Sequence, residues 1–116
     1  MILAVLDDLM FTSKIRTAAN QLGVAVTIAR TGAAALAEMR KNAPALVILD
    51  LNSTRADPLG TVAAMKQDAS LAAIPTIGFV SHVQTDLIDE ARRIGVDEVL
   101  ARSAFTMRLG DILRRS

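Results

Sequence analysis

The chain of 116 residues contains no cysteine, no tryptophan and no tyrosine. Without cysteine it has no disulfide framework, no cysteine-ligated zinc site and no thiol nucleophile. This usage fits a reducing compartment, and we expect a cytoplasmic protein. Long hydrophobic runs are also missing, since none approaches the roughly 18 residues that cross a membrane. The apolar residues 1–6 end at Asp7 and Asp8 and are too short for a signal peptide.

An excess of charge of one sign is missing as well. Lysine and arginine number 13 and aspartate and glutamate 12, which leaves a formal charge of +1, too small for direct binding of nucleic acid. Hydrophobic residues make up 52% and charged residues 22% of the chain, a composition typical of a globular protein. The length predicts one domain, which we place at residues 1–116.

Apolar patterning predicts the architecture. Five short runs without strict alternation predict strands buried on both faces, as in a parallel sheet covered by helices: residues 2–6, 24–29, 46–51, 76–80 and 98–101. Between and after them, helical spacing predicts five amphipathic helices; Gly23 and Gly95 would end the first and fourth, and Asp57-Pro58 would begin the third. The alternation predicts an α/β fold, (βα)5, with a doubly wound, five-stranded parallel sheet in a three-layer sandwich.

Polar residues follow the ends of four predicted strands. Ligands of open α/β sheets bind beyond the carboxyl ends of the strands, where this chain places Asp7, Asp8, Asp50, Asn52, Ser81, His82, Arg102 and Ser103. Carboxylates about 5 Å apart repel by roughly 3 kcal/mol per pair at an effective dielectric near 20. A divalent cation, a protonated carboxyl or an arginine would offset this repulsion, and oxygen-only ligands suit Mg²⁺ best.

These residues resemble the receiver domain of bacterial two-component response regulators over essentially the whole chain. Residues 31–36 (TGAAAL) resemble the family's DGxxAL segment, and residues 44–52 (PALVILDLN) resemble its PDLVILDxxMP run. The acid pair after the first strand and the hydroxyl after the fourth are also features of the family. The resemblance implies a flavodoxin-like fold and a phosphorelay function, with no enzyme activity beyond self-phosphorylation and autodephosphorylation.

The resemblance also implies roles for individual residues. Asp50 matches the phosphoacceptor, whose carboxylate attacks a phosphohistidine or a small phosphodonor. Asp8 matches a direct Mg²⁺ ligand, Asp7 a ligand that acts mainly through water, and the backbone carbonyl of Asn52 the third protein ligand, so the expected cofactor is Mg²⁺. Ser81 matches the switch hydroxyl, which reports phosphorylation to the fourth helix.

The chain departs from the family where Arg102-Ser103 replaces its nearly invariant Lys-Pro. We expect a trans bond before Ser103, because a cis bond costs roughly 3 to 4 kcal/mol before a residue other than proline. Our hypothesis is that Arg102 pairs bidentately with Asp50 or Asp7 in the resting state and competes with Mg²⁺. The aromatic switch of the fifth strand is missing, since its position is Val99. His82 follows the switch hydroxyl, where its bulk would hinder access.

Three functions are compatible with this pattern. The first is a phosphorylated receiver that takes its phosphoryl group from a histidine kinase or a phosphotransfer protein. The second is a pseudo-receiver, a protein-interaction module that is not phosphorylated, which Arg102-Ser103 favours. The third is a phosphatase, because Asp50-Leu51-Asn52-Ser53-Thr54 resembles the DxDxT motif of the haloacid dehalogenase group, although Asn52 replaces the general acid. Receivers often dimerise, so a second copy of the chain is a further candidate partner. The downstream output protein is unknown, and we expect no binding to a membrane.

Overall fold

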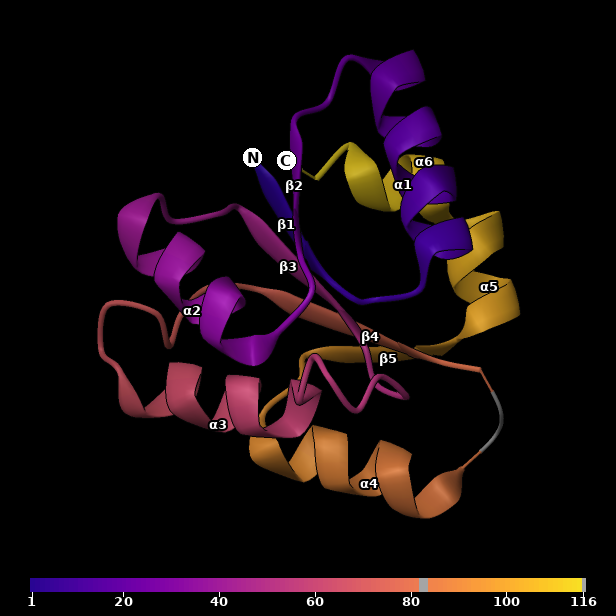
Figure 1. Ribbon diagram of the computed structural model, residues 1–116. Helices are drawn as coiled ribbons and strands as arrows, with labels where there is room; N and C mark the ends of the chain where they lie inside the picture. The colour runs from indigo at the N-terminus through magenta and orange to yellow at the C-terminus, as the bar shows by residue number, and fades with distance from the viewer. Residues whose placement is uncertain (82–83, 116) are drawn as a thin grey trace.

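A parallel sheet of five strands forms the centre of the computed structural model, which describes residues 1–81 and 84–115 (Figure 1). The strands are β1 (Ile2–Val5), β2 (Val26–Ala29), β3 (Leu46–Asp50), β4 (Thr76–Val80) and β5 (Glu98–Ala101). They lie in the order β2-β1-β3-β4-β5, and every neighbouring pair is parallel. The chain reverses its direction of winding at β1, as a doubly wound sheet requires, so the predicted topology is confirmed.

The three central strands, β1, β3 and β4, are buried along their whole length. Side chains alternate between two core clusters, so that Leu3 and Val5 join one and Ile2 and Ala4 join the other. Both faces of the sheet are therefore covered, which explains why the sequence of these strands lacks polar alternation.

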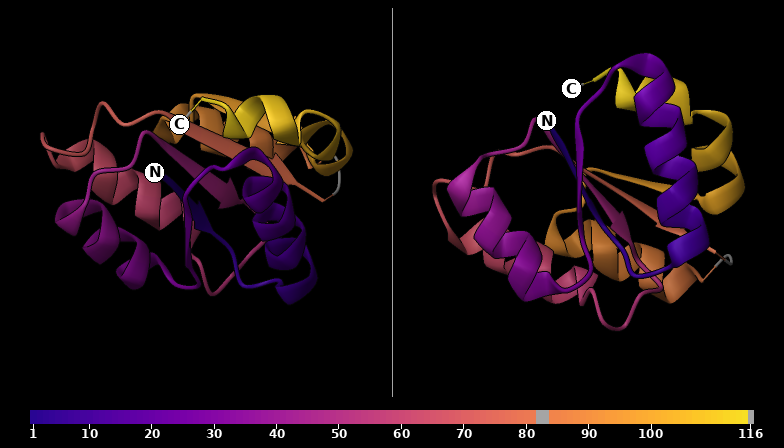
Figure 2. Two further views of the ribbon diagram at one scale, coloured as in Figure 1. Left: turned by 90° about the horizontal axis from the view of Figure 1, so that it is seen from above. Right: turned by 45° about the horizontal axis from the view of Figure 1, so that its top comes forward.

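Six helices flank the sheet within the described residues: α1 (Leu9–Leu22), α2 (Gly32–Lys41), α3 (Pro58–Gln67), α4 (Thr85–Ile94), α5 (Arg102–Met107) and α6 (Leu109–Leu113). Helices α2, α3 and α4 cover one face, and α1, α5 and α6 cover the other (Figure 2). The arrangement is the predicted three-layer sandwich. In the described ranges, none of these helices combines the length and apolar character needed to cross a membrane.

The predicted helix boundaries agree with the structure at three places. Gly23 and Gly95 follow α1 and α4 with φ angles of +70° and +124°, where a residue without a Cβ is least strained. Asp57 caps α3 by accepting a hydrogen bond from the Gly60 amide, and Pro58 is the first helical residue.

The last helix differs from the prediction. The sequence predicted one helix, but Arg108 (φ −100°, ψ 7°) separates α5 from α6. Gly110, which lies just beyond the break, weakens a helix at this point. Helix α5 begins at Arg102, directly after the last residue of β5. No cis peptide bond occurs within residues 1–81 and 84–115, so the expected trans bond before Ser103 is confirmed.

Candidate functional site

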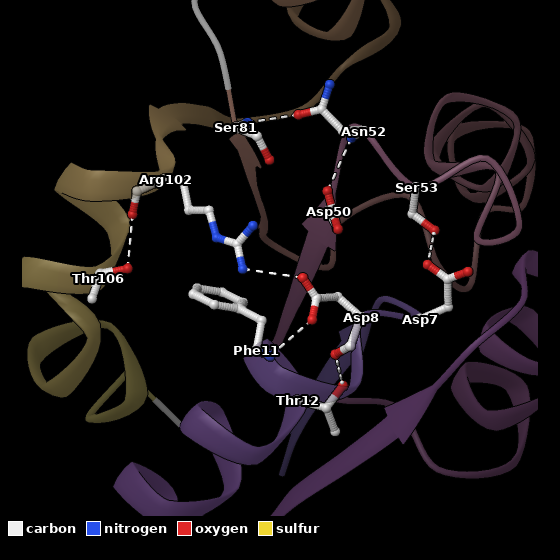
Figure 3. Close-up of polar contacts among 10 residues, drawn as sticks. All are labelled: Asp7, Asp8, Phe11, Thr12, Asp50, Asn52, Ser53, Ser81, Arg102 and Thr106. Carbon is white, nitrogen blue, oxygen red and sulfur yellow. Dashed lines mark hydrogen bonds and ion pairs between the residues drawn. The ribbon is translucent and has the colours of Figure 1, made fainter.

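Polar residues from four separate stretches of the chain meet at the carboxyl edge of the sheet (Figure 3). Asp7 and Asp8 follow β1, Asp50 ends β3, Ser81 follows β4, and Arg102 follows β5. The switch in winding direction places β1 and β3 side by side, so their carboxylates share one space. Of the strand-end residues that the sequence selected, the structure brings six together at this edge: Asp7, Asp8, Asp50, Asn52, Ser81 and Arg102 (Figure 3). His82 lies outside the described residues.

Asp50 is a buried carboxylate, with 7% of its surface exposed. Its Oδ1 accepts a hydrogen bond of 3.0 Å from the backbone amide of Asn52. Burial raises the pKa of Asp50, because desolvation disfavours the charged form; the Asn52 amide and the Arg102 charge oppose this rise, while Asp8 and Asp7 add to it. The side chain is thus fixed through one oxygen at the floor of the site.

Asp8 uses both of its carboxylate oxygens. Oδ1 accepts a hydrogen bond of 3.1 Å from the Phe11 amide and thereby caps α1, while Oδ2 lies 3.1 Å from Nη2 of Arg102. The pKa of Asp8 is lowered, first by the Phe11 amide and then by Arg102. The sequence did not predict this residue as a helix cap, although an aspartate three residues before the amide it binds is typical of one.

Arg102 also lies over an aromatic ring. Its guanidinium carbon is 4.3 Å from the centroid of Phe11, within the range of a cation–π interaction. Phe11 packs against Phe79 and Phe105, with centroids 4.9 Å and 5.9 Å away. The three phenylalanines of the chain therefore form one cluster, which supports the guanidinium from below.

The hypothesis about the partner of Arg102 is corrected by this geometry. Arg102 pairs with Asp8 rather than with Asp50 or Asp7, and it does so through a single nitrogen rather than bidentately. Asp8 is preferred because its Oδ2 is presented beside Phe11, so that one guanidinium position satisfies both the carboxylate and the ring. Sequence spacing alone could not separate three carboxylates that lie so close together.

Asp7 is held by a residue that the sequence did not select for the site. The Ser53 hydroxyl donates a hydrogen bond of 2.8 Å to Oδ1 of Asp7 and accepts one of 3.2 Å from the Ala56 amide. Ser53-Thr54 stands where the motif PDLVILDxxMP has Met-Pro, and that departure is the signal that could have pointed to Ser53. The bond ties the loop after β3 to the end of β1.

Asn52 joins the loop after β3 to the end of β4. Its side-chain oxygen accepts a hydrogen bond of 2.6 Å from the Ser81 amide, and its side-chain nitrogen donates one of 2.5 Å to Gln84. Gln84 precedes α4 directly. The side chain of Asn52 thus has a structural contact that the sequence did not predict, beside the role expected of its backbone carbonyl.

The donor set implied for a divalent cation is Asp7, Asp8, Asp50 and the Asn52 carbonyl. Within the described residues, no group of three or more carboxylate or imidazole side chains is arranged to hold a metal ion. Both oxygens of Asp8 are engaged, and one of them faces a guanidinium. The arrangement in this structure therefore does not fit a divalent cation at Asp8.

Comparison with known proteins identifies relatives of this fold and site. A family model described as the response regulator receiver domain matches residues 2–114. The phosphorylated cyanobacterial phytochrome response regulator RcpA is 29% identical, with a TM-score of 0.81, and the match covers 97% of this chain and 87% of that one. No curated protein sequence matches the chain.

Two further solved structures show the same fold. The Mn²⁺-bound form of the response regulator Rcp1 is 22% identical, with a TM-score of 0.82 over 96% of this chain and 89% of that one. The chemotaxis response regulator CheY4 of Vibrio cholerae is 21% identical, with a TM-score of 0.84 over 98% of this chain and 95% of that one. At these identities the likeness concerns the fold alone, and it agrees with the flavodoxin-like prediction.

Proposed function

Because the chain belongs to the response regulator receiver domain family, we propose that it accepts a phosphoryl group on the carboxylate of Asp50. Receiver domains work in two-component signalling and are not enzymes beyond their own phosphorylation chemistry. The family therefore leaves the phosphatase alternative without support. We propose residues 1–116 as a single receiver domain.

The hydrogen bonding of the Asp50 carboxylate is the observation that supports this proposal. Its Oδ1 is fixed by the Asn52 amide, and no other described residue donates a hydrogen bond to its Oδ2. An attacking oxygen needs a lone pair that no donor occupies, and a fixed carboxylate loses less entropy on reaching the phosphorus atom. Because Asp50 is largely buried, fewer water molecules must leave its carboxylate before the attack than would have to leave an exposed one.

The proposed step is a direct transfer. Oδ2 of Asp50 attacks the phosphorus of a phosphohistidine or an acyl phosphate, and a phosphorus–oxygen bond to Asp50 forms as the bond to the donor breaks. The electron pair of the broken bond leaves with the imidazole or the carboxylate of the donor. The product is an aspartyl phosphate, which water later hydrolyses to regenerate the carboxylate and release inorganic phosphate.

Ser81 and Arg102 are the side chains that we propose to respond to the new charge. The Ser81 amide is already bound to Asn52, so the hydroxyl belongs to a segment that is tied to the loop after Asp50. The Arg102 charge acts on Asp50, because it opposes the rise of the Asp50 pKa. Both side chains lie at the open edge of the sheet where the phosphoryl group would arrive (Figure 3).

Receiver domains typically bind a divalent metal. Mg²⁺ is the ion that oxygen ligands such as Asp7, Asp8, Asp50 and the Asn52 carbonyl would select. The present geometry does not fit it at Asp8, because Arg102 and the Phe11 amide engage both oxygens. The transfer step above is therefore derived from the residues of the chain alone.

A receiver domain implies interaction with a histidine kinase. We propose that the phosphoryl group comes from such a kinase or from a phosphotransfer protein, in the cytoplasm, and that the partner downstream is a protein rather than nucleic acid. A homodimer stays a prediction. The second candidate function is the pseudo-receiver, which the Arg102–Asp8 ion pair favours because it holds the site in one state.

The experiment that separates these two functions is incubation with acetyl phosphate, with and without Mg²⁺, followed by intact-mass measurement. We expect one phosphoryl adduct on the native chain and none on D50N. The control is D57N, because Asp57 caps α3 outside the site and asparagine caps a helix equally well. Absence of an adduct on the native chain in both buffers would overturn the proposal in favour of the pseudo-receiver. An adduct on D50N would overturn it by showing that Asp50 is not the acceptor.

A further inference from the structure

Arg102 is the one side chain among the described residues that forms an ion pair with the carboxylates at the edge of the sheet. Asp7, Asp8 and Asp50 bring three carboxylates into one site. Like charges so close together are unstable without a cation. The guanidinium supplies one positive charge from within the chain.

The position of Arg102 is determined by three independent contacts. Its backbone begins α5 directly after β5, and its carbonyl accepts a hydrogen bond from the Thr106 hydroxyl. Its guanidinium binds Asp8 and lies over Phe11. The guanidinium therefore has two contacts within the site, the Asp8 carboxylate and the Phe11 ring.

A metal ion and this guanidinium would compete for the same oxygen. Oδ2 of Asp8 faces Arg102, and Oδ1 caps α1, so a metal ion on either oxygen would share it with the guanidinium or with the Phe11 amide. Oδ1 of Asp7 is already bound to the Ser53 hydroxyl. A divalent cation would also be repelled by the positive charge that stays nearby.

We propose that Arg102 is the resident cation of this site and takes the place of a divalent metal ion. The native chain then has little affinity for Mg²⁺ or Mn²⁺, and loss of the guanidinium opens Asp8 to either ion. The inference concerns the site of the proposed function, but it requires no phosphorylation. Metal binding therefore tests it separately from adduct formation at Asp50.

The test is isothermal titration of the native chain and of R102M with Mg²⁺ and with Mn²⁺. Methionine keeps an apolar, flexible side chain over Phe11 but has no hydrogen-bond donor. We expect R102M to bind either ion at least about tenfold more tightly than the native chain, as loss of one ion pair and one repulsive charge would produce. Adding D8N to R102M should abolish the gain.

The matched control is K14M. Lys14 lines the same cavity of about 190 Å³ as Asp8 and Arg102, and its ammonium lies 6.0 Å from the Phe11 centroid. The substitution removes the same amount of charge beside the same ring, without opening the ion pair on Asp8, so K14M should bind metal as the native chain does.

Two results would overturn the proposal. One is equal metal affinity in the native chain and R102M, whether both bind or neither does. The other is an equal gain of metal affinity in K14M, which would show that the gain comes from losing any positive charge near the site and not from losing the ion pair with Asp8. The titration of the native chain is informative without any variant, since tight binding there contradicts a resident arginine. A failed adduct at Asp50 would instead reject the proposed function and leave this inference intact.

Discussion

The ion pair between Arg102 and Asp8 should stabilise the fold, and a double-mutant cycle with R102M and D8N measures its contribution. Asparagine still caps α1 by accepting from the Phe11 amide, because it caps helices as well as aspartate does. Thus D8N removes the charge and keeps the cap. R102M removes the guanidinium and keeps an apolar side chain over Phe11.

The expected magnitude follows from exposure. The side chains of Arg102 and Asp8 are 34% and 36% exposed, so solvent screens the pair substantially, and we assign it about 0.5 to 1 kcal/mol. The cation over Phe11 adds about 0.5 to 1 kcal/mol, so R102M should cost roughly 1 to 2 kcal/mol in the free energy of unfolding. With about 2.1 cal/mol/K of unfolding entropy per residue over 116 residues, each kcal/mol lowers the melting temperature by about 4 °C.

The sign of the D8N effect should depend on the background. In the native chain, D8N loses the ion pair and gains relief from repulsion by Asp7 and Asp50, so a cost of about 0.5 kcal/mol is expected. In the R102M background there is no pair left to lose, and D8N should be neutral or stabilising. The coupling between the two substitutions is therefore about 0.5 to 1 kcal/mol and favourable.

Thermal and urea unfolding followed by far-ultraviolet circular dichroism is the suitable assay, because the chain has no tryptophan to report unfolding by fluorescence. The coupling should shrink in about 1 M salt, where the Debye length is about 3 Å. Equal costs of D8N in both backgrounds, at low salt, would refute the ion pair as a stabilising contact.

Three further predictions concern the same edge of the sheet. Because burial raises the pKa of Asp50, its ionised form opposes folding; D50N should melt above the native chain at neutral pH, with the gain vanishing below about pH 3.9, where the unfolded carboxyl is protonated. S53A should cost about 1 to 2 kcal/mol in urea unfolding, since it leaves the Ala56 amide without its acceptor; no loss would contradict the contact between Ser53 and the Ala56 amide. G78A should cost about 1 to 3 kcal/mol, because a Cβ there would lie 2.8 Å from a methyl carbon of buried Leu51, and unchanged stability would show that Leu51 can move.

The sheet could be predicted from the sequence because strands buried on both faces appear in it as short, continuous apolar runs. Strands such as Leu46–Asp50 are covered on both faces, and this selects apolar side chains at every position before the polar residue at the strand end. The ends of these strands then carry the first polar residues, so Asp7, Asp8 and Asp50 were recognisable as candidates for one site. The resemblance to receivers added their roles, which still await the experiments above.

The contacts inside the site could not be predicted, since they depend on how helices pack. Arg102 selects Asp8 only because α1 and α5 lie on the same face of the sheet and present Phe11 beneath the guanidinium. The bond between Ser53 and Asp7 joins residues 46 positions apart; the departure from the family motif at Ser53 could point to the residue but not to its partner. The break at Arg108 likewise reflects the balance between local helix propensity and the core that α6 must reach.

The phenylalanine cluster also determines how this protein can be observed. With no indole or phenol ring in the chain, near-ultraviolet absorption and dichroism arise mainly from Phe11, Phe79 and Phe105. The three rings pack against one another, and the guanidinium lies over one of them, Phe11. A spectral change on adding a phosphodonor would thus report from a single spot in the molecule, with no label attached.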